Sequence, residues 1–187
     1  ESRNFDIRKT LLKFDNVLND QRQVIFSQRN TIINSEDIFS ISNDFLSEIT
    51  QNLISLKDKN ISNPKNSEFT NQLKLILGKS FNENEINELI ESKNNELKEK
   101  IEEKFKFKRN ERIKFLNEKQ ANEIEKRLFL QTIDVNWKSH IQYLEQLRQV
   151  IGLRSYGQRD PLIEYKKEAF TLFENLLEKL KFDYVTI

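Results

Sequence analysis

Apolar residues recur every three, four or seven positions near the start of the chain, with charged and polar residues between them. The series is Ile7, Leu11, Phe14, Leu18, Ile25 and Ile32, which is the spacing of one apolar face of an α-helix. Neither glycine nor proline interrupts residues 2–33. The pattern therefore predicts one long helix, roughly 48 Å at about 1.5 Å per residue.

Shorter helices are predicted for the middle of the chain. Apolar positions at helical spacing mark a second helix over residues 38–56 and a third over residues 69–77, which Gly78 ends. Ser80 stands three residues before Glu83, which is the spacing of a capping box and predicts the start of a fourth helix. We expect these short helices to form a small subdomain.

The last third of the chain predicts a helical hairpin. A highly charged helix begins near Ser92 and meets no helix breaker until residue 152. Residues 152–161 hold two of the three glycines and one of the two prolines, so this segment is predicted to be a loop. Asp160 is a good N-cap and Pro161 a good first helical residue, and a last helix is expected to begin there. Its inward-facing positions are predicted to be Tyr165, Ala169, Leu172, Phe173, Leu176 and Leu180.

The composition makes most kinds of catalytic chemistry unlikely for this chain. The 187 residues include no cysteine and one histidine, His140, which excludes disulfide scaffolds, thiol nucleophiles and Cys-ligated zinc. We interpret His140, which lies near Trp137, as a packing or partner-contact residue and not as a metal ligand or base. Residues 78–80 read Gly-Lys-Ser, but Leu73 stands where a phosphate-binding loop needs glycine. We interpret them as a helix stop followed by a helix cap.

The charges on the chain name no partner by themselves. Lys and Arg number 31 against 30 Asp and Glu, which is not the basic balance of a nucleic-acid binder, so no nucleic acid is expected. Phe105 and Phe107 interleave with basic residues, a pattern that suits an anionic membrane surface or RNA but more often marks an ordinary solvated helix face. These basic residues are Lys104, Lys106, Lys108, Arg109, Arg112 and Lys114. The chain holds no methionine, so we expect it to be a piece of a longer protein.

The predicted loop is the segment whose residues best suit contact with a partner. Tyr156 is flanked by Arg154 and Arg159, and Gly152 and Gly157 provide hinges. The equally supported alternative is a tyrosine folded back onto its own hairpin with the arginines in solvent. The residues alone thus indicate an all-α scaffold with an exposed tip.

Two stretches of the chain carry longer motifs. Residues 3–22 contain Arg3-Asn4-Phe5-Asp6-Ile7-Arg8-Lys9, Leu12 and Asp15-Asn16-Val17-Leu18-Asn19-Asp20-Gln21-Arg22. The second stretch contains Leu130-Gln131-Thr132-Ile133-Asp134, Trp137, His140, Leu147-Arg148-Gln149, Gly152-Leu153-Arg154, Tyr156, Gln158, Asp160-Pro161, Glu164-Tyr165-Lys166 and Phe170. The first stretch resembles the start of the long scaffold helix, and the second the two-helix finger, of the SecA family of bacterial preprotein translocase motors.

The resemblance implies three parts. Residues 1–35 would be the first long helix of the helical scaffold, residues 36–124 an inserted helical wing domain, and residues 125–187 the two-helix finger of the scaffold. The residues expected to pack the finger against the first helix are Ile133, Trp137, Ile141 and Leu144.

The resemblance also implies which residues of the tip make contacts. Tyr156 matches the family's tip tyrosine, which contacts the translocating preprotein. The flanking residues expected near the channel or preprotein are Leu153, Arg154, Gln158 and Arg159, with Gly152 and Gly157 as loop hinges.

The function that the resemblance implies is to couple the movement of motor domains to the SecY channel and to unfolded preprotein. The expected partners are the parent's motor domains, the SecY channel complex, unfolded preprotein and, as a candidate, anionic phospholipid. No cofactor and no catalysis are expected in this piece, because ATP and Mg²⁺ would bind the parent's motor domains. The implied location is cytoplasmic, peripherally on the inner face of the bacterial plasma membrane. The alternative is a free-standing helical adaptor or coiled-coil protein built on the heptad-like first helix.

Overall fold

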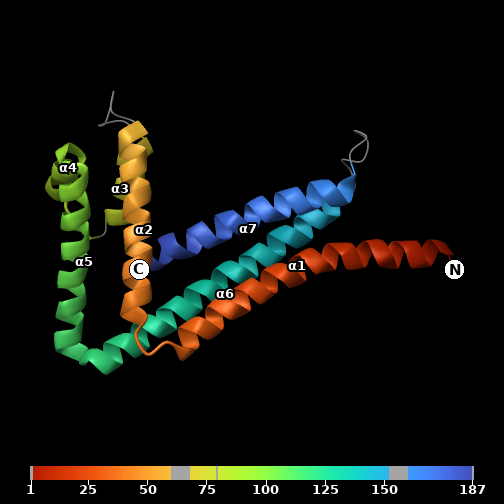
Figure 1. Ribbon diagram of the computed structural model, residues 1–187, viewed down its shortest axis with the longest axis horizontal. Coiled ribbons are helices and arrows are strands. Elements are labelled where there is room, and N and C mark those ends of the chain that lie inside the picture. The colour runs from red at the N-terminus through yellow and green to blue at the C-terminus, as the bar shows by residue number, and fades with distance from the viewer. Residues whose placement is uncertain (1, 60–67, 79, 152–159, 187) are drawn as a thin grey trace. The chain divides into compact units, whose positions relative to one another are not determined.

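The computed structural model describes residues 2–59, 68–78, 80–151 and 160–186, with side chains described at residue 9 and from residue 11 onward. These residues form seven helices and no strand (Figure 1), which confirms the predicted all-α fold. The helices are α1 (Ser2–Asn34), α2 (Ile38–Lys59), α3 (Glu68–Leu77), α4 (Glu83–Glu91), α5 (Asn94–Leu116), α6 (Glu118–Ile151) and α7 (Pro161–Thr186).

The chain divides into two compact units. The first unit consists of Glu1–Ser35 and Phe129–Leu180, and the second of Glu36–Leu128 and Lys181–Ile187. The compact units therefore differ from the predicted ranges at two places, because the second unit extends to Leu128 and includes the end of α7. Tyr184 explains the second difference, since its hydroxyl donates to Glu125 of the second unit at 2.8 Å.

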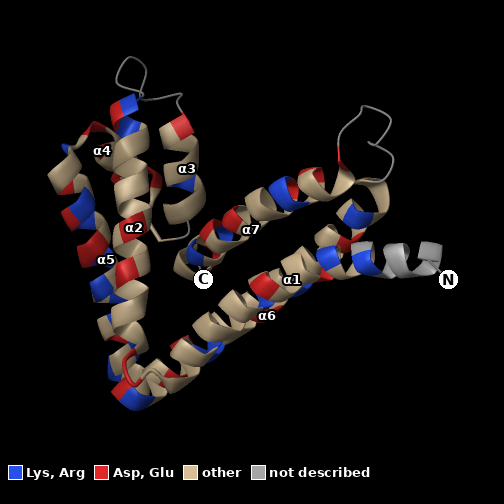
Figure 2. Cartoon of the chain, turned by 45° about the vertical axis from the view of Figure 1, so that its right-hand side comes forward, with Lys and Arg blue, Asp and Glu red and all other residues tan. Residues whose placement is uncertain are grey.

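The first unit contains α1 and most of the α6–α7 hairpin, which lie side by side in both views (Figures 1 and 2). Phe14, Ile25 and Ile32 are buried, as the apolar spacing of α1 predicts. Leu11, by contrast, is 42% exposed, so its predicted place in the core is wrong. Leu11 lies one turn before Phe14. The described part of α6 ends at Ile151, which packs in the same cluster as Phe14, so α6 ends about one turn short of Leu11.

The second unit is built from the short helices α2 to α5 together with the start of α6 and the end of α7. Helix α2 packs against α3 and α5, and α4 packs against both α3 and α5. The fully buried side chains that these helices contribute are Ile38, Leu53, Phe69, Leu73, Leu77, Leu89, Leu97 and Ile101.

Asn82, and not Ser80, is the N-cap of α4, so the predicted capping box is wrong by two residues. The Asn82 side chain accepts from the Glu85 backbone N–H at 2.8 Å, and the Glu85 carboxylate accepts from the Asn82 N–H at 2.8 Å. Asn caps a helix as well as Ser does. The predicted stop after α3 is confirmed, because α3 ends at Leu77 and a side chain at Gly78 would collide with the Lys74 carbonyl oxygen.

Asn117 divides the stretch that the sequence predicts as one helix. Its φ of 60° and ψ of 162° end α5, and α6 begins at the next residue. The Asn117 side chain accepts from the Gln120 N–H at 3.0 Å and so caps α6. The predicted single helix is wrong at this point because Asn117 adopts a backbone conformation that is nearly exclusive to glycine, and no glycine or proline in the sequence marks the break.

Basic and acidic residues are interspersed along the helices (Figure 2), as expected for helix faces exposed to water. None of the helices in the described ranges has the length and apolar character needed to cross a membrane.

Candidate functional site

The predicted tip residues lie outside the described residues. They are Gly152, Leu153, Arg154, Tyr156, Gly157, Gln158 and Arg159. The two helix ends that lead to them are described. Helix α6 ends at Ile151, and α7 begins at Pro161, where the Asp160 carboxylate accepts from the Leu162 N–H at 2.8 Å. This confirms Asp160 as the predicted N-cap of the last helix.

An apolar cluster lies at the end of the hairpin that leads to the tip. Phe14 from α1 packs edge-on against Tyr165 from α7, with ring centroids 4.8 Å apart. The cluster is completed by Leu144, Leu147, Ile151 and Ala169. Burial raises the pKa of the Tyr165 hydroxyl, so this ring stays neutral at physiological pH. All three helices of the first unit thus meet beside the predicted loop.

A buried polar link joins the same three helices farther from the tip. The Gln21 amide of α1 donates from Nε2 to the Ala169 carbonyl of α7 at 3.0 Å, and its Oε1 lies 2.8 Å from His140 Nε2 of α6. Burial lowers the pKa of His140 from 6.5 to about 4, so the ring is neutral at pH 7. The interpretation of His140 as a packing residue agrees with its burial, and the described residues hold no cluster of ligands suited to a metal ion.

The four predicted packing residues occupy different depths in the first unit. Ile133 and Leu144 are fully buried, whereas Trp137 and Ile141 are only partly buried. The Trp137 ring stacks on His140 with centroids 5.5 Å apart and an interplanar angle of 27°. Trp137 therefore covers a buried polar residue at the edge of the core instead of filling its centre.

Two ion pairs at the surface link α1 to α6 on either side of Gln21. Arg148 Nη1 donates to Asp15 at 2.9 Å, and Arg29 pairs with Asp134 through two bonds of 3.1 and 3.3 Å. Arg29 lies fourteen residues after Asp15, and Asp134 lies fourteen residues before Arg148. The two helices therefore run antiparallel in one continuous register.

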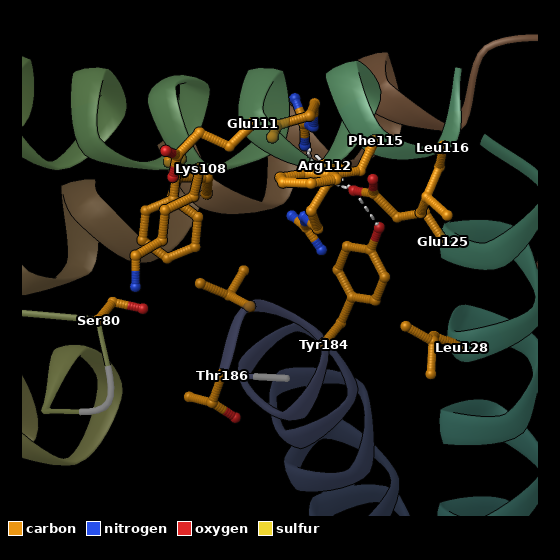
Figure 3. Close-up of a pocket in the computed structure, with 15 residues that line it drawn as sticks. Ser80, Lys108, Glu111, Arg112, Phe115, Leu116, Glu125, Leu128, Tyr184 and Thr186 are labelled. Atoms are coloured by element: carbon orange, nitrogen blue, oxygen red, sulfur yellow. Dashed lines mark hydrogen bonds and ion pairs between the residues drawn. The ribbon is translucent and has the colours of Figure 1, made fainter. Parts of the chain in front are cut away.

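The second unit contains a pocket of about 730 Å³. Figure 3 shows Tyr184 reaching from α7 towards Glu125 of α6 at this pocket. The polar and charged residues that line the pocket are Ser42, Ser80, Lys108, Arg109, Glu111, Arg112, Glu125, Tyr184 and Thr186. The apolar residues that line it are Leu46, Phe105, Phe115, Leu116, Leu128 and Val185.

A buried charged cluster forms one wall of this pocket. Glu125 Oε1 accepts from Tyr184 at 2.8 Å, from Ser42 at 3.0 Å and from Arg109 at 3.1 Å. Burial, and then the charge of Glu125, raise the pKa of Tyr184 well above its usual value. The hydroxyl therefore serves as a hydrogen-bond donor and not as a proton-transfer group. The cluster ties α2, α5, α6 and α7 together.

The basic stretch on α5 is only partly available to a partner. Arg109 is taken up by the buried cluster, and Lys104 pairs with Glu85 at 2.6 Å. Phe107 and Phe115 are exposed on the same helix. Contact between this basic stretch and an anionic surface stays a prediction.

The polar groups that organise both units went unrecognised in the sequence. Gln21 stands at a core position of the α1 periodicity, between Leu18 and Ile25, and a polar residue at such a position was the available signal. The sequence pattern groups Arg109 with the basic residues of a solvated helix face, and its partner Glu125 is sixteen residues away. The spacing gave no sign that this pair would be buried.

Comparison with known proteins identifies relatives over the whole chain. The family described as "SecA Wing and Scaffold domain" matches residues 1–187. Protein translocase subunit SecA of Pelagibacter ubique is 69% identical over 187 residues, which are 100% of this chain and 22% of that protein. The SecA subunit of Caulobacter vibrioides is 39% identical, with 97% of this chain and 20% of that protein covered. The SecA subunit of Buchnera aphidicola is 44% identical, with 100% of this chain and 22% of that protein covered. The chain thus spans about a fifth of the length of the curated relatives it matches.

Proposed function

Because this chain belongs to the SecA wing and scaffold family, we propose that it is the scaffold and wing portion of an ATP-driven protein translocase. In this proposal the first unit is the helical scaffold with its two-helix finger, and the second unit is the helical wing. ATP and Mg²⁺ bind motor domains of the parent protein outside this chain. The chain itself transmits movement and is not catalytic.

The observation that carries the proposal is the way α1 lies along the α6–α7 hairpin. Contacts between α1 and α6 extend from the Asp15–Arg148 pair to the Arg29–Asp134 pair. The apolar cluster around Phe14 and the Gln21 link add contacts to α7. A helix held at several levels cannot shift without moving its neighbours, because a packed interior does not deform continuously. Motor-domain movement applied to α1 is therefore carried to the hairpin.

The hairpin in turn carries the tip to the SecY channel and the unfolded preprotein. Tyr156 contacts the preprotein in this proposal, and Leu153, Arg154, Gln158 and Arg159 lie near the channel mouth, with Gly152 and Gly157 as hinges. The buried end of α6 at Ile151 and the capped start of α7 at Asp160 support this role, because a loop delivers its side chains reproducibly only from a fixed base. The site of action is the cytoplasmic face of the plasma membrane.

Anionic phospholipid is a further proposed partner, through α5 of the second unit. Exposed Phe107 and Phe115 stand beside exposed Lys106 and Lys114, a combination that suits the interface of an anionic bilayer. Binding to phosphatidylglycerol vesicles should fall with added salt and with the double variant Lys106→Glu/Lys114→Glu. Equal binding to vesicles of neutral lipid would contradict this contact.

The experiment that tests the proposed function places a photocrosslinking amino acid at position 156 of the full-length parent protein. The protein is combined with reconstituted SecY channel and a stalled preprotein, with and without ATP. We expect crosslinks to the preprotein or the channel that depend on the nucleotide. A crosslinker at exposed Asn175 of α7 serves as the control. Crosslinks from position 156 only within its own chain would contradict the proposed role of the tip.

A further inference from the structure

Gln21 is a polar residue at a core position of α1. The apolar spacing assigns this position to the interior, and its side chain is 7% exposed. Burying an amide in an apolar interface is unfavourable unless its hydrogen bonds are replaced. A leucine at this position would pack α1 against the hairpin without any hydrogen bond. Apolar packing alone therefore does not explain why an amide stands here.

The hydrogen bonds of Gln21 reach both helices of the hairpin. Nε2 donates to the Ala169 carbonyl of α7, which fixes Oε1 as the acceptor for His140 Nε2 of α6. His140 is held in place by Trp137 on one side and by Phe173 of α7, whose centroid is 5.8 Å away, on another. Because burial keeps the ring neutral, its proton lies on Nε2, where Gln21 accepts it. A single side chain thus connects α1, α6 and α7.

These bonds select one register, which apolar packing alone does not do. A helix lying in an apolar groove has neighbouring registers one turn, or about 5 Å, away with similar burial. Directional bonds from a buried amide are satisfied in one of them only, as with a buried asparagine that sets the register of a coiled coil. We propose that Gln21 is a positioning residue that fixes α1 against the α6–α7 hairpin in a single register. The inference rests on the proposed function, in which α1 moves the hairpin.

The surface ion pairs favour the same register but are poorly suited to hold it alone. In the Arg29–Asp134 pair the two side chains are 37% and 57% exposed, and Asp15 in the other pair is 56% exposed. Exposed pairs contribute little and are screened by salt. The Gln21 link is neutral and buried, so salt should leave it intact.

The register can be measured by distances between pairs of spin labels. The chain has no cysteine, so two introduced cysteines carry the labels without further changes. Exposed Lys13 on α1 is labelled together with exposed Lys138 on α6 in one sample and exposed Asn175 on α7 in another. The native chain should give one narrow distance distribution in each sample. In Gln21→Leu, both should gain a second population displaced by about 5 Å, one helical turn.

Two further variants separate positioning from a general loss of stability. Gln23→Leu makes the same chemical change at an exposed position of α1 and should leave both distributions single. Gln21→Glu keeps an acceptor for His140 and should retain a single α1–α6 distance, although it loses the donor to Ala169. Circular dichroism establishes that each variant is folded.

A measurement on the native chain keeps the inference testable if Gln21→Leu does not fold. In 1 M salt the ion pairs are screened, and both distributions should remain single. Broadening in salt, or single unshifted distances in folded Gln21→Leu, would overturn the inference. Neither result bears on crosslinking from position 156, so the failure of this inference and that of the proposed function can be told apart.

Discussion

The two units bury polar groups in different ways. The first unit uses a neutral link between Gln21 and His140, whereas the second uses the charged pair Arg109–Glu125 with Tyr184. A neutral amide costs little to bury once it is hydrogen-bonded, but a buried charge costs several kcal/mol unless its partner stays in place. In the first unit, the buried polar link fixes the position of α1 along the hairpin. In the second unit, the buried charged pair mainly determines whether the unit stays folded.

The largest effect should come from breaking the charged pair. Arg109→Met leaves Glu125 buried without its counter-charge, and we expect a loss of about 3–5 kcal/mol in the free energy of unfolding, measured in urea. The double variant Arg109→Met/Glu125→Leu should recover much of this loss, because no charge remains buried. A double variant as unstable as the single one would show that the pair is not the cause.

The apolar core of the first unit should give the next largest effect. Leu144 is 2% exposed, so Leu144→Ala should cost about 2–5 kcal/mol in the same urea measurement. Leu12→Ala, at a position 61% exposed, should change stability by less than about 0.5 kcal/mol. Trp137→Ala should cost less than the removal of a fully buried tryptophan. Similar losses for Leu144→Ala and Leu12→Ala would contradict the assigned core.

The neutral link should make the first unit sensitive to acid. His140 has a pKa of about 4 when folded and 6.5 when unfolded, so the unfolded chain takes up a proton first. Its contribution to stability is complete above pH 6.5 and is lost as the pH falls towards 4. We expect an effect of intermediate size in urea unfolding at a series of pH values. His140→Phe should flatten the curve over this range, and an identical slope in the variant would rule out His140 as its source.

A smaller effect of opposite sign is expected in the second unit. Asn117 has φ 60° and ψ 162°, a backbone region that is nearly exclusive to glycine and costs about 1–3 kcal/mol for other residues. Asn117→Gly loses a helix cap, which costs only a few tenths of a kcal/mol when glycine replaces asparagine. The variant should therefore gain about 1 kcal/mol in thermal or urea unfolding. A loss of stability would mean that the cap outweighs the strain.

The smallest effect should be that of the surface pairs. Asp134→Asn removes the exposed Arg29–Asp134 pair, and we expect a change of at most about 1 kcal/mol. The change should shrink further in 0.5 M salt. A loss as large as that of Arg109→Met would remove the distinction between the two units.

The sequence predicted helices better than their breaks and partners. The periodicity from Phe14 to Ile32 and the Asp160–Pro161 start depend on local spacing, and both agree with the structure. The break at Asn117 is not predicted, because no glycine or proline stands there to signal the change in backbone direction. The contact between Tyr184 and Glu125 joins residues 59 positions apart, and nothing in the local pattern encodes it. The tip around Tyr156 stays a prediction, since it lies outside the described residues.

The central claim is that α1 and the hairpin move as one body. The most direct measurement is the distance between spin labels at Lys13 and Lys138 in the full-length parent bound to the channel, before and after ATP is added. The account predicts one distance that does not change through the nucleotide cycle. A distance that shifts by about one helical turn, or about 5 Å, with nucleotide would contradict it, because α1 would then slide along the hairpin instead of carrying it.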